Sequence, residues 1–262
     1  MESFNIGRTL SRAANLARDS LVTVGVFLFV IQALGVLLQY ATMSQLRATL
    51  LSAQQPGNPA AALAIFGSGW YWGSMLISLG VASLAYAGAI AGMLKLSERG
   101  TTSVADCFTA GFAKLLPFLG LSILAGITVG LGFVLLVVPG IILVLMWSVA
   151  APAMLGENIG IIASLGRSRA LTKGSRLMIF VTLLIVGIAI YVIMFAVIGA
   201  LLGLRMGSMA TDVVGNPLAM AFALLYGWVG MIAGNALMVA IYLETLAIKG
   251  GGPVGHLDEV FA

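Results

Sequence analysis

Long apolar runs separated by short polar segments dominate the pattern of this chain. A helix that crosses the hydrocarbon core of a bilayer needs roughly twenty largely apolar residues, at about 1.5 Å of rise each. Five runs reach this length, and a sixth is shorter. The predicted spans are residues 21–43, 70–94, 115–138, 141–155, 177–203 and 218–248. The pattern therefore predicts an all-α fold, a polytopic bundle of six transmembrane helices.

The fourth predicted span, residues 141–155, is the shortest of the six. It follows the third span after Pro139-Gly140, a dipeptide that is typical of a tight turn. Pro152 should kink or end this span, because proline lacks the N–H that a helix interior uses. We therefore expect a tight hairpin at Pro139-Gly140, with a short and interrupted second arm.

Lys and Arg are distributed unequally between the two sides of this predicted bundle. On one side only Arg47 and Arg205 occur, and the other basic residues all fall in the N-terminal segment, the alternate connections and the C-terminal end. Basic residues accumulate in the cytoplasmic segments of membrane proteins. The pattern thus predicts that both termini are cytoplasmic, and a five-span count would break it.

The N-terminal segment has an amphipathic helical pattern before the first span. Ile6 and Leu10 fall on one face of a helix, and Arg8 and Arg12 fall on the other. Such a helix is suited to lying in the membrane interface. The segment is also too polar, and the following apolar run too long, for a cleaved signal peptide.

Similar short segments precede the third and fifth spans. Ser103 and Asp106 have the spacing of a capping box at a helix start. Before the fifth span, Ile161, Ile162 and Leu165 form an apolar face ahead of a basic stretch. We predict one integral membrane domain of three units, each a cytoplasmic amphipathic helix followed by a transmembrane hairpin. The units are residues 1–100, 101–156 and 157–262.

Composition agrees with a membrane location. Of the 262 residues, 61% are hydrophobic and 8% are charged, which is more apolar surface than a soluble domain can hide from water. The formal net charge is +4, and no basic cluster lies among aromatic residues. This excludes the usual pattern of a nucleic-acid-binding domain.

Catalytic groups are scarce. The chain has one histidine, His256, and one cysteine, Cys107, so neither a paired Ser and His nor a His-Glu-x-x-His zinc site can be assembled. One cysteine and one histidine do not make a metal site. The aspartates lie outside the predicted spans, which excludes an intramembrane protease with two aspartates. We expect a protein that is not an enzyme, with no catalytic residue, metal or cofactor.

Polar residues inside the spans are few. Glu244 lies near the cytoplasmic end of the last span, either as an interfacial carboxylate held by a nearby Arg or Lys, which we favour, or as an ion or proton site. Gln32, Gln39 and Asn235 either join helices by hydrogen bonds, which we again favour, or contact a substrate. A polar cavity on which these three amides converged would favour transport.

The basic stretch before the fifth span is the segment with most functional interest. On a continuous helix Arg169, Lys173 and Arg176 fall at i, i+4 and i+7 and share one stripe, with Arg167 nearby. The stretch is either a signal that fixes the topology or a site for anionic phospholipid headgroups. Such headgroups attract juxtamembrane basic residues by about 1 kcal/mol each.

Several short motifs in the middle of the chain resemble a known family. Residues 137–142 (Val-Val-Pro-Gly-Ile-Ile), then Ala150-Ala151-Pro152, Ile162-Ala163-Ser164 and Arg167-Ser168, resemble the YciC-like bacterial inner-membrane proteins. The same pattern is similar to the membrane domain attached to some glycerophosphodiester phosphodiesterases. The resemblance covers residues 130–180, and it implies a bacterial inner-membrane protein. It carries over no phosphodiesterase activity, because no residues remain for the soluble catalytic barrel.

Together these patterns predict a non-enzymatic multi-pass protein of the bacterial inner membrane. Its expected partners are membrane lipids, anionic phospholipids among them, and a membrane or envelope protein or a second copy of the chain. The alternative is a transporter or channel for a lipid-like or small uncharged solute.

Overall fold

The computed structural model describes residues 4–53, 67, 69–204 and 217–249, and in these residues the chain is helical with no strand. Arg205 and His256 lie outside the described residues. The helices are α1 (Ile6–Asp19), α2 (Val24–Ala53), α4 (Gly69–Arg99), α5 (Val104–Ala113), α6 (Leu115–Leu135), α7 (Val137–Trp147), α8 (Ala150–Gly156), α9 (Ile161–Thr172), α10 (Arg176–Leu204) and α11 (Pro217–Ile248).

Six segments in the described part of the chain are long and apolar enough to cross a membrane, which confirms the predicted number. They are Val24–Thr42, Gly69–Arg99, Leu115–Leu135, Val137–Gly156, Arg176–Ala196 and Leu224–Ile248. A helix satisfies its backbone hydrogen bonds internally, which is the requirement for crossing hydrocarbon. The protein is therefore a multi-pass membrane protein by the length and composition of its helices.

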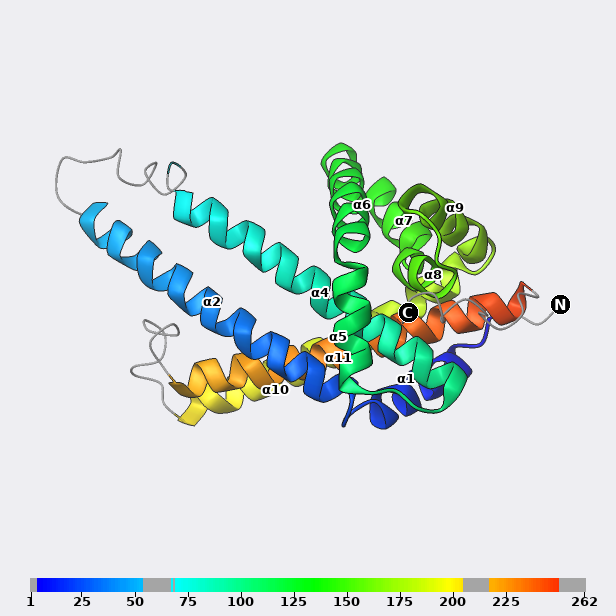
Figure 1. Cartoon of the computed structure of the whole chain (residues 1–262), viewed down its shortest axis with the longest axis horizontal. Helices are drawn as coiled ribbons and strands as arrows, with labels where there is room; N and C mark the ends of the chain where they lie inside the picture. Colours follow the sequence, from blue (N-terminus) through cyan, green and yellow to red (C-terminus); the bar gives the residue numbers. More distant parts are fainter. Residues whose placement is uncertain (1–3, 54–66, 68, 205–216, 250–262) are drawn as a thin grey trace.

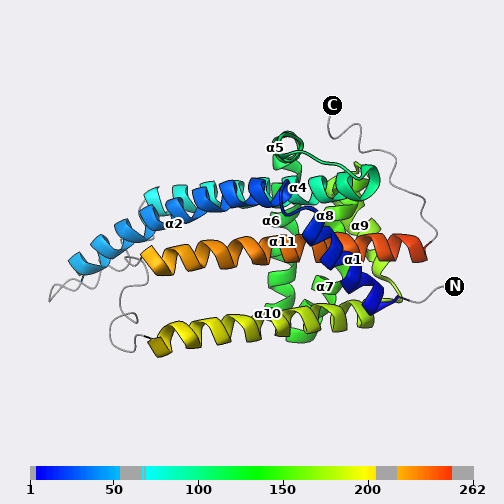
Figure 2. The same cartoon turned by 90° about the horizontal axis from the view of Figure 1, so that it is seen from below.

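Helix α4 forms the centre of the fold. It packs against α2, α5, α6, α8 and α11, and the residues from Ala87 to Leu94 along it are all buried. Figure 2 shows α2 with α4, then α11, then α10 as successive layers, with α1 lying across α11 and reaching α10. In Figure 1, α6 runs across the common direction of α2 and α4, and α7, α8 and α9 gather beside it.

Helix pairing differs along the chain. Helix α2 packs along α4, and α6 packs along α7. Among the described residues, however, the main contacts of α10 are with α1 and α7, and Figure 2 shows it apart from α11. Only 11% of the apolar window of α10 is buried, so this helix leaves most of its surface to lipid. The predicted third hairpin is therefore not a packed pair of helices.

Three prolines mark the helix boundaries in the middle of the chain. Pro117, Pro139 and Pro152 are each the third residue of a helix, namely α6, α7 and α8. The N–H groups in the first turn of a helix have no intrahelical acceptor. A proline at this position therefore removes no helical hydrogen bond. The residue four positions earlier is the last or the capping residue of the preceding helix in each case. The prolines thus end one helix and begin the next.

This pattern corrects the predicted position of the turn before the fourth span, and it shows the interruption that Pro152 was expected to cause. The turn lies at Leu136, whose backbone is extended (φ −165°, ψ 148°), and Pro139-Gly140 belongs to the first turn of α7. The interruption lies at Ser148 and Val149, ahead of Pro152, because proline removes the bond that the carbonyl of Ser148 would accept. The carbonyl of Met146 accepts a hydrogen bond from the hydroxyl of Ser168 at 2.8 Å and a longer one from the hydroxyl of Thr172 at 3.4 Å.

The short helices α1 and α5 are packed onto the bundle. In α1 the buried residues are Thr9, Ala13 and Leu16, and its main partner is α11. Helix α5 begins with the predicted capping box, which Ser103 and Asp106 form with both bonds present. Both helices therefore contact protein along their apolar faces.

Glycine allows α5 to approach α4 closely. A Cβ atom on Gly88 would lie 2.5 Å from the carbonyl oxygen of Cys107 and 2.5 Å from Cζ of Phe27. A Cβ atom on Gly92 would lie 2.6 Å from Sγ of Cys107. Lipid gives helices no hydrophobic reason to associate, so close packing of small residues stabilises their association instead.

Candidate functional site

Glu244 lies where α1 crosses α11, and only 1% of its side chain is exposed. The Nε of Arg8 donates to both carboxylate oxygens at 2.9 and 3.1 Å, and its Nη2 donates to Oε1 at 2.6 Å. Nη1 of Arg12 lies 3.7 Å from Oε2, and the backbone N–H of Asn5 donates to Oε1 at 3.4 Å. The buried charge is thus paired and hydrogen-bonded, as a structural carboxylate requires.

Glu157 forms a second ionic cluster at the end of α8. The Nε of Arg167 donates to both of its carboxylate oxygens at 2.8 Å, and the hydroxyl of Tyr242 donates to Oε1 at 3.2 Å. Next to it, Nζ of Lys114 donates to Oδ1 of Asn158 at 2.6 Å. These contacts join α8, α9 and α11 with the start of α6.

Asp106 forms a third cluster at the start of α5. Its carboxylate lies 2.8 Å from Nζ of Lys95 and accepts a hydrogen bond from the backbone N–H of Ser103. Burial acts to raise the pKa of Asp106, but the bonds from Lys95 and Ser103 outweigh it, and the pKa lies below its ordinary value. Burial, together with the charge of Asp106, raises the pKa of Cys107 to about 12, which keeps this thiol protonated and unreactive.

The prediction that Arg169, Lys173 and Arg176 share one stripe of a single helix is wrong. Helix α9 ends at Thr172, Lys173 has an extended backbone, and α10 begins at Arg176. Gly174 makes the turn with φ of 91°, a conformation that favours glycine. Arg169 and Arg176 therefore lie on different helices. Of the apolar residues predicted for this amphipathic segment, Ile162 is 72% exposed and Leu165 is buried.

The basic residues of this region separate into two groups. Arg167 forms an ion pair with Glu157. Arg169 and Lys173 are exposed, and no ion pair or hydrogen bond joins their side chains to another described residue. Arg176 is half-buried, and its Nε has no hydrogen-bond partner in the described part of the chain.

Arg18, at the end of α1, is exposed beside a shallow apolar hollow of about 290 Å³. The hollow lies between α1 and α11, and Leu21, Trp228 and Ile232 are among its lining residues. Trp228 is held in place by a 2.6 Å hydrogen bond from its Nε1 to the carbonyl of Gly25. A cation next to an apolar hollow suits the headgroup and the upper acyl chain of a phospholipid.

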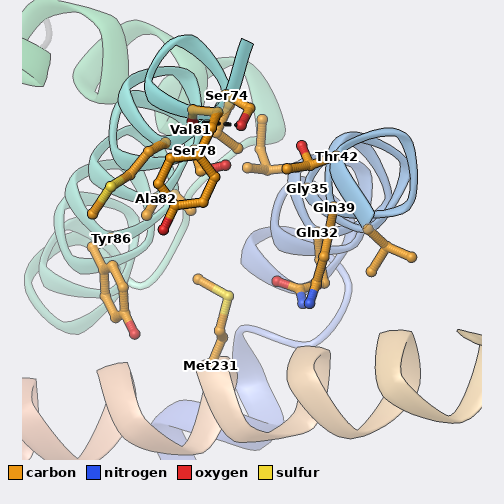
Figure 3. A pocket seen from close by; sticks show the side chains of 15 residues that line it. Gln32, Gly35, Gln39, Thr42, Ser74, Ser78, Val81, Ala82, Tyr86 and Met231 are labelled. Atoms are coloured by element: carbon orange, nitrogen blue, oxygen red, sulfur yellow. Dashed lines mark hydrogen bonds between the residues drawn. The ribbon is translucent and has the colours of Figure 1, made fainter. Parts of the chain in front are cut away.

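A larger groove of about 520 Å³ lies between α2 and α4, with Met231 of α11 at its floor. Gln32 and Gln39 line it from α2, and Ser78 and Tyr86 line it from α4. In Figure 3 the amide of Gln32 and the side chain of Met231 both point into the space between the two helices. The structure therefore brings together two of the three predicted amides.

Asn235, the third predicted amide, is not among the residues that line this groove. It is 2% exposed, and its Nδ2 donates to the carbonyl of Met231 one turn earlier on the same helix, at 2.7 Å. Tyr71, Ser74 and Ser78, which form a polar stripe on the groove face of α4, were not among the residues predicted from the sequence. Their i, i+3, i+7 spacing is a signal that the sequence contains.

Among the described residues, no group of three His, Cys, Asp or Glu side chains could hold a metal ion. No family model matches the chain. No curated protein and no solved structure matches it either.

Proposed function

We propose that this chain is a non-enzymatic multi-pass protein of the bacterial inner membrane that binds anionic phospholipid headgroups at its cytoplasmic end. The observation that carries the proposal is the separation of its basic residues into two groups. Arg8, Arg167 and Lys95 are neutralised by buried or half-buried carboxylates. Arg169 and Lys173 are exposed without such a partner among the described residues.

Cations that serve only to fix the fold would be expected to have acidic partners within the chain. Exposed cations next to a bilayer attract anionic headgroups by about 1 kcal/mol each. The apolar hollow beside Arg18 adds a surface for an acyl chain, which a topology signal does not need.

Location and orientation are part of the proposal. The distribution of Lys and Arg supports cytoplasmic termini, and the bacterial inner membrane is the location that the resemblance of residues 130–180 implies. Reporter fusions within residues 44–69 test the orientation, because this connection is expected on the non-cytoplasmic side. Activity of a cytoplasmic reporter at this position would reverse it.

Native mass spectrometry of the gently extracted protein tests lipid binding. The variant is Arg169→Gln/Lys173→Gln, and the matched control is Arg47→Gln/Arg205→Gln, which removes the same charge from connections expected on the other side. Retention of phosphatidylglycerol should fall about thirtyfold in the first variant, the effect of about 2 kcal/mol for two charges, and little in the second. Equal retention in the first variant and the unchanged protein would reject the headgroup site.

A second function, transport of a lipid-like or small uncharged solute, is supported by the groove between α2 and α4. Two of the three predicted intramembrane amides line one groove, which is the kind of polar feature that a solute-binding site uses. The buried and self-bonded position of Asn235 counts against a path that crosses the whole bundle.

A further inference from the structure

The groove between α2 and α4 contains polar side chains that form no hydrogen bond with another described residue. The hydroxyls of Thr42 and Ser74 bond to carbonyls of their own helices, each at 2.9 Å. By contrast, no hydrogen bond joins the side chains of Gln32 and Gln39 to another described residue. An amide without a partner in an apolar medium is unfavourable, so these groups need water or a ligand.

The amide of Gln32 is held at the floor of the groove. A Cβ atom on Gly227 would lie 2.6 Å from its Nε2, so the amide rests against the backbone of α11 where a side chain is absent. The amide thus lies against α11 and points into the groove, as Figure 3 shows.

The lining also indicates the kind of molecule that would bind. None of the described residues that line the groove is charged, and most of the surface that they present is apolar. An ion would find no counter-charge, whereas an amide can donate and accept hydrogen bonds with an ester, a hydroxyl or another amide. The groove thus suits an apolar chain with an uncharged hydrogen-bonding group.

The size of the groove suits a small ligand. The groove has about 520 Å³, which is within the usual range for small-molecule sites.

We propose that this groove binds an uncharged amphiphile of the monoglyceride class, with its polar group hydrogen-bonded to Gln32 and Gln39. The site deepens the second function proposed above, since it would be the solute-binding site of a transporter. It is independent of the phospholipid site, because the two sites share no residue.

Photolabelling of the full chain in phosphatidylcholine nanodiscs tests the proposal. The probe is a monoglyceride with a diazirine in its acyl chain, and mass spectrometry locates the labelled peptides. Labelling of α2 and α4 should saturate and should be displaced by monoolein, but not by oleate or oleylamine, which have a similar chain and a charged head. Labelling of α6 and α10 should rise without saturation, because these helices contact bulk lipid.

The variant Gln32→Leu/Gln39→Leu keeps the volume of both side chains and removes the hydrogen bonds. Saturable labelling should fall at least fivefold, the effect of about 1 kcal/mol. Thr128→Val on α6 is a control, since the Thr128 hydroxyl bonds only to its own helix. Unchanged α6 labelling and circular dichroism in the double variant would show that the fold is intact.

Three results would overturn the proposal. They are labelling of α2 and α4 that monoolein does not displace, equal displacement by the charged amphiphiles, and unchanged labelling in a folded double variant. Saturable, displaceable labelling without movement of monoolein between leaflets would support the site while rejecting transport.

Discussion

The guanidinium of Arg8 and the carboxylate of Glu244 meet at 2.6 Å, although 236 positions separate them in the chain. This contact joins the first helix to the last predicted span. The carboxylate is almost fully buried and the arginine is 41% exposed, so the two partners respond differently to mutation.

Removal of Arg8 should destabilise the protein more than removal of both partners. Arg8→Leu leaves the buried carboxylate with Arg12 at 3.7 Å and the N–H of Asn5 at 3.4 Å, and we expect a loss of about 2–3 kcal/mol, below the range for fully buried pairs because Arg8 is partly exposed. Arg8→Leu/Glu244→Leu should recover at least half of this loss. Unfolding in mixed detergent micelles, followed by circular dichroism, measures both values. Equal losses in the single and double variants would show that Glu244 does not need a counter-charge.

Alanine at Gly88 should destabilise the crossing of α4 and α5. Its Cβ would lie 2.5 Å from a backbone oxygen that cannot move without shifting α5, and overpacking of this kind costs about 1–3 kcal/mol. Gly130→Ala on α6 is the control, because nothing lies within 4 Å of a Cβ there. The control should be neutral or slightly stabilising, since alanine favours a helix. Thermal unfolding of the two purified variants compares them directly, and a Gly88→Ala protein as stable as the control would contradict the close contact.

Ser168 and Ser164 provide a matched pair in α9. Both side chains are fully buried, but Ser168 donates to the carbonyl of Met146 at the interruption before α8, whereas Ser164 donates to Ile161 in its own helix. Ser168→Ala leaves that carbonyl with only the longer bond from Thr172 at 3.4 Å and should cost about 1 kcal/mol. Ser164→Ala should cost less, because the carbonyl of Ile161 keeps its helical bond. The difference in free energy of unfolding between the two variants tests this, and a larger effect at Ser164 would be the contrary result.

The ion pair of Asp106 and Lys95 should make stability depend on pH in the acid range. Because the pKa of Asp106 is lower in the folded protein than its ordinary 3.8, the stabilisation is complete above that pH and is lost as the pH falls through the folded value. Asp106→Asn should remove this dependence and cost about 1 kcal/mol near neutral pH, since the pair is partly exposed. Stability measured from pH 2 to pH 7 in both proteins checks the sign. A wild-type protein that gains stability below pH 3 relative to Asp106→Asn would contradict it.

The positions of the helices could be predicted from the sequence because each span is a local property. A long apolar segment must form a helix in hydrocarbon whatever its neighbours are, since only internal hydrogen bonds are available there. The same is true of the capping box at Ser103 and Asp106, which lie within one turn. The turn at Pro139-Gly140 was placed wrongly because proline is equally suited to the first turn of a helix, where α7 uses it.

The sequence by itself thus determined that the protein has six apolar helices and which polar residues they carry. Only the tertiary structure decided that Gln32 and Gln39 share a groove while Asn235 bonds to its own helix, and that Arg8 is the partner of Glu244. The physical reason is that helices in lipid are apolar on every side. No hydrophobic face then indicates which neighbour each helix has, and close packing at glycines such as Gly88 and Gly227 makes that choice.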